Sequence, residues 1–404
     1  MANQNNRPEG GITQAALLDD PEFLKGIVEG VLQELLEVEM TSHLGAAPYE
    51  RSDSRRGQRN GYKPRTLRTR VGTLRLLVPQ DRDGSFSTAI FGRYQRNEKA
   101  LVLALMEMYL QGVSTRKVTE VTEALCGTSF SASLVSHLCS QLDAELSAWR
   151  GRPLGGHPYP YLFVDARYED IRVSGQVVSQ GALVVSAVRA DGKREIVAVE
   201  VADTESEATY NELFADLKQR GLSGVRLTVS DDHSGLKAAL KRYFQGSSWQ
   251  RCQVHFSRNA MGRTSRKNRK ELARDLRRVF RAEDRNEARR QASEIAAKWS
   301  QACPAAAQLI DEHIEECFEA FSFPESHRPR IRSTNSLERL NQEIKRRTRV
   351  VRIFPNRESC LRLVSALCVE QSEEWTSGKL YLNMEDLKEG LEPNQKALEL
   401  ALVT

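Results

Sequence analysis

The hydrophobic pattern of this chain changes its period near residue 160, and this change limits the folds that the chain can adopt. Up to residue 150, apolar residues recur mostly at helical spacing. Beyond the Gly- and Pro-rich stretch 151–160, three β-rich runs follow, and helices then alternate with further strands. Hairpin-connected strands followed by this alternation predict an α/β domain with a mixed sheet.

The part before residue 150 is predicted to be mostly helical. A helix is expected over 20–45, whose apolar stripe would form a core face or a dimer contact. Alternating apolar residues around Gly72 predict a small β-hairpin with a basic face. Three further helices are expected near 97–111, 114–125 and 131–149, the last two opening on a Ser that can cap them. Their short Gly-containing turn is similar to that of a helix-turn-helix, so this part could bind DNA.

The part after the strands is predicted to be an all-α insertion followed by a return to the core. Residues 258–330 are rich in Arg, Ala and Glu and show no sheet-like pattern. A last long helix is expected to begin in STNSLERLNQEIKRRTRVV, with Ser333 or Thr334 as its cap. The whole chain therefore divides into five expected parts, at 1–95, 96–150, 151–257, 258–330 and 331–404.

Positive charge is concentrated in three segments. The chain carries a net charge of +5, but segment 51–75 alone carries nine Lys or Arg and one acid. Segment 263–290 carries twelve against five, and segment 339–352 six against one. Such blocks on an otherwise acidic chain favour a polyanionic partner, most simply double-stranded DNA. The candidate contacts are Arg55, Arg56, Arg59, Lys63, Arg65, Arg68, Arg70, Arg258, Arg266, Lys267, Arg269, Lys270, Asn335, Arg339, Lys345, Arg346, Arg347 and Arg349.

The composition excludes several other classes of protein. A hydrophobic fraction of 40% in 404 residues can bury a core, so a largely disordered chain is excluded. No stretch approaches the roughly 20 apolar residues of a membrane helix, and the N-terminus lacks the apolar core of a secretion signal. Seven cysteines without a CxxC pair are expected to be reduced thiols in a cytoplasmic protein.

Three carboxylates stand out by their positions. Asp165 follows the apolar run YLFV in the first expected strand, and Asp231 ends the run VRLTVS just before a helix. Ligands of α/β sheets bind at the carboxyl ends of strands. Glu338 lies between two leucines of the last long helix. The neighbouring Asp232 could replace Asp231 as a ligand or cap the following helix.

Three carboxylates of this kind can hold two divalent metal ions for in-line attack on a phosphodiester. One ion activates the attacking hydroxyl or water, and the other stabilises the leaving oxygen. Oxygen ligands favour Mg²⁺, and Mn²⁺ is expected to substitute for it.

Cys252 and His255 form a second local pattern, with the spacing CxxH. They could supply half of a zinc site, although no second pair of ligands occurs at a suitable spacing. Alternatively, they line the active site with His255 near a phosphate, or they are a buried thiol and a core imidazole.

The strings VDARYED, VSDDHSGLKAAL, QRCQVHFSRN and IRSTNSLERLNQEIKRRTRVVRIFPN, in this order, resemble those of the bacterial Mutator-type insertion-sequence transposases. Those enzymes belong to the DDE superfamily and have a ribonuclease-H-like catalytic core. The similarity extends over about residues 20–380. It implies that Asp165, Asp231 and Glu338 are the catalytic triad, and it matches Cys252 and His255 to the family's C-x-x-H element.

The resemblance further implies a function. The chain is expected to bind the terminal inverted repeats of a mobile element as a homodimer, and to cleave and transfer DNA strands with Mg²⁺ through a circular intermediate. Two alternatives stay open at this point. One is a ribonuclease-H-like nuclease that cuts without joining, and the other is a non-catalytic DNA-binding regulator.

Overall fold

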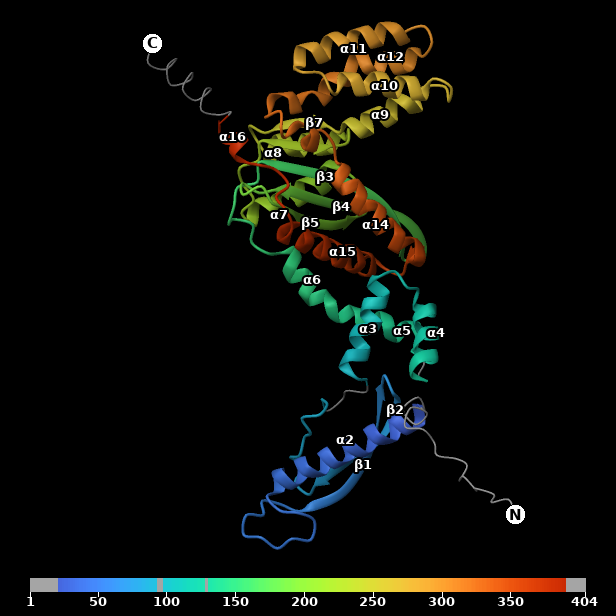
Figure 1. Cartoon of the computed structure of the whole chain (residues 1–404), viewed down its shortest axis with the longest axis vertical. Helices are drawn as coiled ribbons and strands as arrows, with labels where there is room; N and C mark the ends of the chain where they lie inside the picture. The colour runs from blue at the N-terminus through green and yellow to red at the C-terminus, as the bar shows by residue number, and fades with distance from the viewer. Residues whose placement is uncertain (1–20, 93–96, 128–129, 390–404) are drawn as a thin grey trace, which may run out of the picture. The chain divides into compact units, whose positions relative to one another are not determined.

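A computed structural model describes residues 21–92, 97–127 and 130–389 of the chain (Figure 1). The first residue of the helix expected over 20–45, and the segments 1–20 and 390–404 of the expected parts, therefore lie outside the described residues. The chain forms two compact units, Met1–Cys139 and Ser140–Thr404. No helix within the described ranges is long and apolar enough to span a membrane.

The first unit begins with a helix packed on a β-hairpin. Helix α2 (Pro21–Leu44) lies on strand β2 (Gly72–Asp81), which pairs antiparallel with β1 (Arg59–Thr69). Gly72 has a φ of 113°, a backbone conformation that suits glycine at this turn. One face of α2 shares a core with the hairpin, made by Leu36, Leu67, Leu74, Leu76, Val78 and Phe91. The expected helix and hairpin are thus confirmed.

The opposite face of α2 is apolar and exposed. Its side chains are between 37% and 64% exposed, and they are Phe23, Ile27, Val31, Leu35 and Val38. The stripe predicted from the sequence therefore divides into a core face and an uncovered face.

After the hairpin and an irregular segment over 82–92, the described part of the first unit contains α3 (Lys99–Leu110), α4 (Thr115–Cys126) and α5 (Ala132–Cys139). The predicted cap of α4 is confirmed, because the Ser114 side chain accepts a hydrogen bond of 3.2 Å from the backbone N–H of Lys117. The predicted single helix over 131–149 is wrong, because α5 ends at Cys139.

The second unit opens with the remainder of that predicted helix. A 3₁₀ turn (Ser140–Leu142) leads into α6 (Asp143–Arg150). Here Asp143 receives hydrogen bonds of 2.6 and 2.8 Å from Arg362 of α15 (Arg357–Ser377). This contact with a residue more than two hundred positions away directs α6 onto α15.

A six-stranded mixed sheet forms the centre of the second unit. Its strands are β3 (Tyr161–Val173), β4 (Gln176–Val188), β5 (Arg194–Ala202), β6 (Leu227–Ser230), β7 (Ser248–Arg251) and β8 (Ile353–Phe354). The order is β5-β4-β3-β6-β7, with β3, β4 and β5 antiparallel, and with β6 parallel to β3 and β7 parallel to β6. Helices α7 (Glu207–Gln219) and α8 (Ser234–Tyr243) share one apolar core with this sheet. The predicted mixed sheet is confirmed.

The middle of β3 has a strand neighbour on one side only. Strand β6 pairs with β3 at residues 161–163, and β8 pairs with it at 170–171. Residues 164–169 between these contacts pair only with β4. This opening in the sheet, hereafter the β3 gap, contains Asp165.

The chain between β7 and the last long helix is helical. It forms α9 (Gln253–Gly262), α10 (Arg269–Val279), α11 (Arg285–Trp299), α12 (Pro304–His313) and α13 (Arg328–Ile331), and Figure 1 shows α10–α12 grouped at one end of the unit. They have a separate core that includes Leu276, Ile295, Trp299, Ile310 and Phe318. Pro304 occupies the first position of α12, where proline fits a helix. Strand β7 ends at Arg251, and α9 starts at Gln253, so Cys252 lies directly between them.

After this helical region the chain returns to the sheet. Helix α14 (Asn335–Val351) packs against β3 and leads into β8, and α15 then lies against β3 and β5. The short α16 (Glu385–Glu389) follows.

Candidate active site

The β3 gap brings the three predicted carboxylates into one neighbourhood. Asp165 lies within β3, Asp231 directly follows the last residue of β6, and Glu338 is in the first turn of α14. Since β6 ends beside the gap and α14 packs on β3, residues from three distant parts of the chain meet there.

Asp165 is the most buried of the three carboxylates, with 7% of its surface exposed. Its Oδ2 accepts a hydrogen bond of 2.7 Å from Nδ2 of Asn341 on α14. The pKa of Asp165 is raised to about 6, mainly by burial and also by the charges of Asp231 and Glu338, while His255 acts to lower it. A cation beside Asp165 would relieve this repulsion.

Asp231 and Asp232 have opposite environments. Burial and the charge of Glu205 raise the pKa of Asp231. Burial also acts to raise the pKa of Asp232, but Lys237 and Arg251 outweigh it and the net pKa is lowered. Asp232 lies 2.6 Å from Nζ of Lys237 and 3.0 Å from Nη1 of Arg251. Asp232 is thus already neutralised, whereas Asp231 is not.

The cap of α8 differs from the expected one. His233 occupies the cap position, where its Nδ1 accepts a hydrogen bond of 3.4 Å from the backbone N–H of Leu236. The idea that Asp232 caps this helix is wrong, because its carboxylate is held by the two cations instead.

Glu338 faces the helix α9. Its Oε1 lies 2.8 Å from Nη2 of Arg258 and 3.8 Å from Nε2 of His255. Arg258 was expected to contact DNA, and in the structure its guanidinium pairs with this carboxylate.

Cys252 and His255 lie at the beginning of α9, next to Glu338. Cys252 is fully buried, and its Sγ accepts hydrogen bonds of 3.4 Å from both the backbone N–H and the hydroxyl of Thr334. Nδ1 of His255 is buried and meets hydrogen-bond geometry with no described residue, yet the neighbouring Cys252 raises the pKa of His255 to about 9. The carboxylates Asp165 and Asp231 raise it as well. A cationic imidazole therefore borders the three carboxylates.

The donor set suits a divalent cation, but its side chains are held apart. Among the described residues, no group of three or more His, Cys, Asp and Glu side chains is close enough together to hold a metal ion. Two of the carboxylates are held by other residues, Glu338 by Arg258 and Asp165 by Asn341. Burial still raises the pKa values of Asp165 and Asp231, and carboxylate oxygens of this kind fit Mg²⁺. Binding would require the Arg258 contact to rearrange.

Two residues at this site were not predicted from the sequence. Asn341 lies three positions after Glu338, so helical spacing puts both on one face of α14. That spacing could have identified it. Glu205, which acts on Asp231, lies in the loop after β5, and no local pattern distinguishes it there.

The predicted DNA contacts of the first unit divide into paired and exposed side chains. Arg59 lies 2.6 Å from Glu37, Arg70 lies 2.9 Å from Glu98, and Arg65 donates to the backbone of Gly92. Arg55 also donates to backbone carbonyls, and Arg68 lies over the ring of Phe130. Arg56 and Lys63 are exposed to solvent.

The predicted contacts of the second unit divide in the same way. Arg347 is buried, and with Arg346 it binds Glu343. The exposed members are Arg266, Lys267, Arg269, Lys270, Asn335, Arg339, Lys345 and Arg349. Buried Arg347 is thus a structural residue of α14, whereas Lys345 and Arg349 face solvent.

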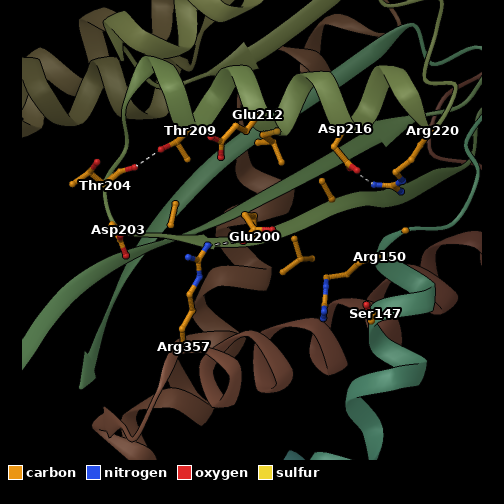
Figure 2. A pocket seen from close by; sticks show the side chains of 15 residues that line it. Ser147, Arg150, Glu200, Asp203, Thr204, Thr209, Glu212, Asp216, Arg220 and Arg357 are labelled. Atoms are coloured by element: carbon orange, nitrogen blue, oxygen red, sulfur yellow. Dashed lines mark hydrogen bonds and ion pairs between the residues drawn. The ribbon is translucent and has the colours of Figure 1, made fainter. Parts of the chain in front are cut away.

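A separate cavity of about 610 Å³ lies beside β5, between α7 and the helices α6 and α15 (Figure 2). Nη2 of Arg357 lies 2.8 Å from Oε1 of Glu200, and Nη1 of Arg220 lies 3.0 Å from Oδ2 of Asp216. These charged side chains of the cavity wall are therefore already paired with one another. None of the three candidate carboxylates lines it.

Comparisons with known proteins identify the relatives of this chain. A family model described as "Transposase, Mutator family" matches residues 6–378. The transposase for insertion sequence element ISRM5 of Rhizobium meliloti is 48% identical over 95% of this chain and 97% of its own length. The transposase of IS256 in transposon Tn4001 of Staphylococcus aureus is 42% identical over 89% of this chain and 93% of its own. The Drosophila P element transposase strand transfer complex aligns with 76% of this chain and 85% of its own at a TM-score of 0.30 and 10% identity, a similarity too low to establish a common fold.

Proposed function

Because the chain belongs to the Mutator family of transposases and is therefore an enzyme that cleaves DNA and transfers its strands, we propose that Asp165, Asp231 and Glu338 form its catalytic site. The observation that carries this proposal is their meeting at the β3 gap from a strand, a strand end and a helix. The raised pKa values of Asp165 and Asp231 support it, since unpaired charge at one place is typical of a functional site.

The fold is proposed to be ribonuclease-H-like, with the helices α9–α13 as an insertion. Three antiparallel strands next to two parallel ones, in the order β5-β4-β3-β6-β7, support the first part. The separate apolar core of these helices supports the second.

Membership of this family implies the use of a divalent metal ion, and we infer that the ion is Mg²⁺. Two bound ions would activate the attacking oxygen and stabilise the leaving one. Asp165, Asp231 and Glu338 would hold them, and Mn²⁺ would serve as a substitute. Asn341 would orient the Asp165 carboxylate, while Asp232 would keep Lys237 and Arg251 in place.

The DNA substrate is proposed to be the terminal inverted repeats of the element that encodes this chain. The relatives are named as transposases of insertion sequences, which supports this assignment. The first unit, with exposed Arg56 and Lys63, would bind the repeats. Exposed cations on α14 and near α10 would contact the phosphates of the cleaved end and of flanking or target DNA.

The transposase is further proposed to act as a homodimer and to pass through a circular DNA intermediate. Pairing two ends requires two sets of DNA contacts, which a twofold-symmetric dimer supplies. The uncovered apolar face of α2 supports the dimer as a contact surface.

The test uses purified full-length protein with Mg²⁺ and a labelled duplex that carries the terminal sequence of its own element. Wild type is compared with Glu338→Gln and with Asp232→Asn, which changes a carboxylate already bound by two cations. Cleavage and joining by wild type and Asp232→Asn, but not by Glu338→Gln, are expected. If wild type binds the end without cutting it, the catalytic assignment is wrong and a regulator is favoured. If it cuts but never joins the labelled end to a target duplex, a nuclease is favoured.

A further inference from the structure

The beginning of α14 is fixed to the beginning of α9 by an unusual set of hydrogen bonds. Thr334 occupies the cap position of α14, but its side chain makes no capping hydrogen bond. It donates instead to Sγ of Cys252, as does the Thr334 backbone N–H, both at 3.4 Å. The backbone N–H of Gln253 donates 3.1 Å to the carbonyl of Arg332. The segment 332–334 is therefore held at three points.

These hydrogen bonds are buried, so water cannot readily replace either partner. Cys252 and Thr334 both have no exposed surface. Loss of the sulfur acceptor would leave two buried donors without a partner, which costs more than the net value of the bonds themselves.

A second contact lies one helical turn further along both helices. His255 follows Cys252 by three positions, and its Nε2 lies 3.8 Å from Oε1 of Glu338. On α14, the backbone N–H of Glu338 donates 2.9 Å to the carbonyl of Thr334. Cys252 thus contacts the residue that begins the turn, and His255 contacts the residue that completes it. Cys252 and His255 are three positions apart, and Thr334 and Glu338 are four positions apart, so each pair spans about one helical turn.

We propose that Cys252 and His255 are positioning residues, which hold the first turn of α14 so that the Glu338 carboxylate faces Asp165 and Asp231. This role rests on the proposed function, since it matters for catalysis only where Glu338 is a metal ligand. This positioning role differs from two roles considered from the sequence, which are the binding of zinc and direct contact of His255 with a phosphate. Removal of a group that orients a metal ligand without binding the metal itself typically lowers the metal affinity by about 10- to 100-fold.

The first measurement needs no metal, DNA or activity. Amide hydrogen exchange is followed over residues 335–340 in wild type, Cys252→Ala and Cys252→Ser. We expect Cys252→Ala to exchange at least about tenfold faster in this segment, because opening of the turn no longer breaks the sulfur contacts. Cys252→Ser keeps an acceptor and should stay within about threefold of wild type. Cys368→Ala, which removes an equally buried thiol on α15, is the matched control and should leave the segment unchanged.

The second measurement is the Mg²⁺ concentration that gives half of the maximal rise in melting temperature. Cys252→Ala should need about tenfold more Mg²⁺ than wild type, and Cys252→Ser should restore most of the affinity. The positioning role is overturned if exchange in 335–340 is unchanged in Cys252→Ala, if Cys252→Ser is as impaired as Cys252→Ala, or if faster exchange leaves Mg²⁺ affinity intact. Failure of the proposed function has a different signature, in which Glu338→Gln responds to Mg²⁺ as wild type does while the exchange results stay as expected.

Discussion

Asn341 donates a hydrogen bond of 2.7 Å to Asp165 from the same face of α14 that carries Glu338. One helix thus supplies both a proposed metal ligand and the group that orients a second one. The geometry of the site depends on how α14 lies on β3.

Replacement of Asn341 should therefore weaken metal use without removing a ligand. We expect Asn341→Ala to raise the Mg²⁺ concentration for half-maximal cleavage by about tenfold or more, because the Asp165 carboxylate loses its orienting donor. The measurement is the cleavage rate as a function of Mg²⁺. Gln342→Ala, at the exposed neighbouring position, is the control and should behave as wild type. Equal behaviour of the two variants would contradict the assigned role.

The two adjacent aspartates should respond in opposite ways to amide substitution. Asp231→Asn should lower the rate of strand cleavage by about 10³-fold or more, because a metal ligand contributes several kcal/mol to the transition state. Asp232→Asn should stay within about fivefold, because Lys237 and Arg251 still bind an amide oxygen. Single-turnover cleavage measures both, and the reverse order would transfer the ligand role to Asp232.

The raised pKa of Asp165 predicts a pH-dependent stability in the absence of metal. Its pKa of about 6 in the folded chain exceeds the usual value of 3.8, so the folded state binds this proton more tightly than the unfolded one. The contribution of this proton to the free energy of unfolding is complete below about pH 4, and it disappears as the pH rises through 6. Asp165→Asn should thus be more stable than wild type at pH 7.5, by up to about 3 kcal/mol. Denaturant unfolding in EDTA checks this, and the same gain at pH 4 would contradict it.

The apolar face of α2 should control self-association if it is the dimer contact. A charge at Val31 would be buried there, so Val31→Glu should weaken dimerisation at least about 100-fold. Val177→Glu makes the same change at a similarly exposed valine of β4 and serves as the control. Sedimentation equilibrium measures both variants, and a dimer that tolerates Val31→Glu must use another surface.

The cations of α14 should differ in what they contribute. The Lys345→Ala/Arg349→Ala variant should make the negative slope of log affinity against log salt shallower by about two, since each phosphate contact contributes about 0.9 to its magnitude. Arg347→Ala should leave that slope unchanged and instead lower stability, because its buried guanidinium binds Glu343. DNA binding titrated over a range of salt distinguishes the two. An unchanged slope in the double variant would place the phosphates elsewhere.

The two aspartates could be located from the sequence because their strands are buried on both faces. The first appears as the continuous apolar run YLFV, and the second as the run VRLTV, whose strand residues LTVS are all buried, and each run ends near an acid. The helices also followed from their spacing. Local patterns were sufficient where each element is defined by its own residues.

Features that depend on distant contacts could not be predicted. The helix expected over 131–149 breaks because Asp143 binds Arg362, and Thr334 gives up its capping role because a sulfur from α9 lies within reach. Arg347 looked like a member of a basic run, although Glu343 binds it inside the fold. In each case a tertiary partner outweighs the local preference.

The origin of the site from distant parts of the chain also has a consequence for synthesis on the ribosome. Asp165 and Asn341 are separated by 176 residues, and Glu338 emerges with Asn341. At roughly 5–20 residues per second, about 10–35 seconds pass between the appearance of the first carboxylate and that of α14. Throughout this interval the nascent chain already carries the basic segment 51–75 but lacks the proposed ligand Glu338, so the proposed DNA contacts of that segment would be present before cleavage is possible.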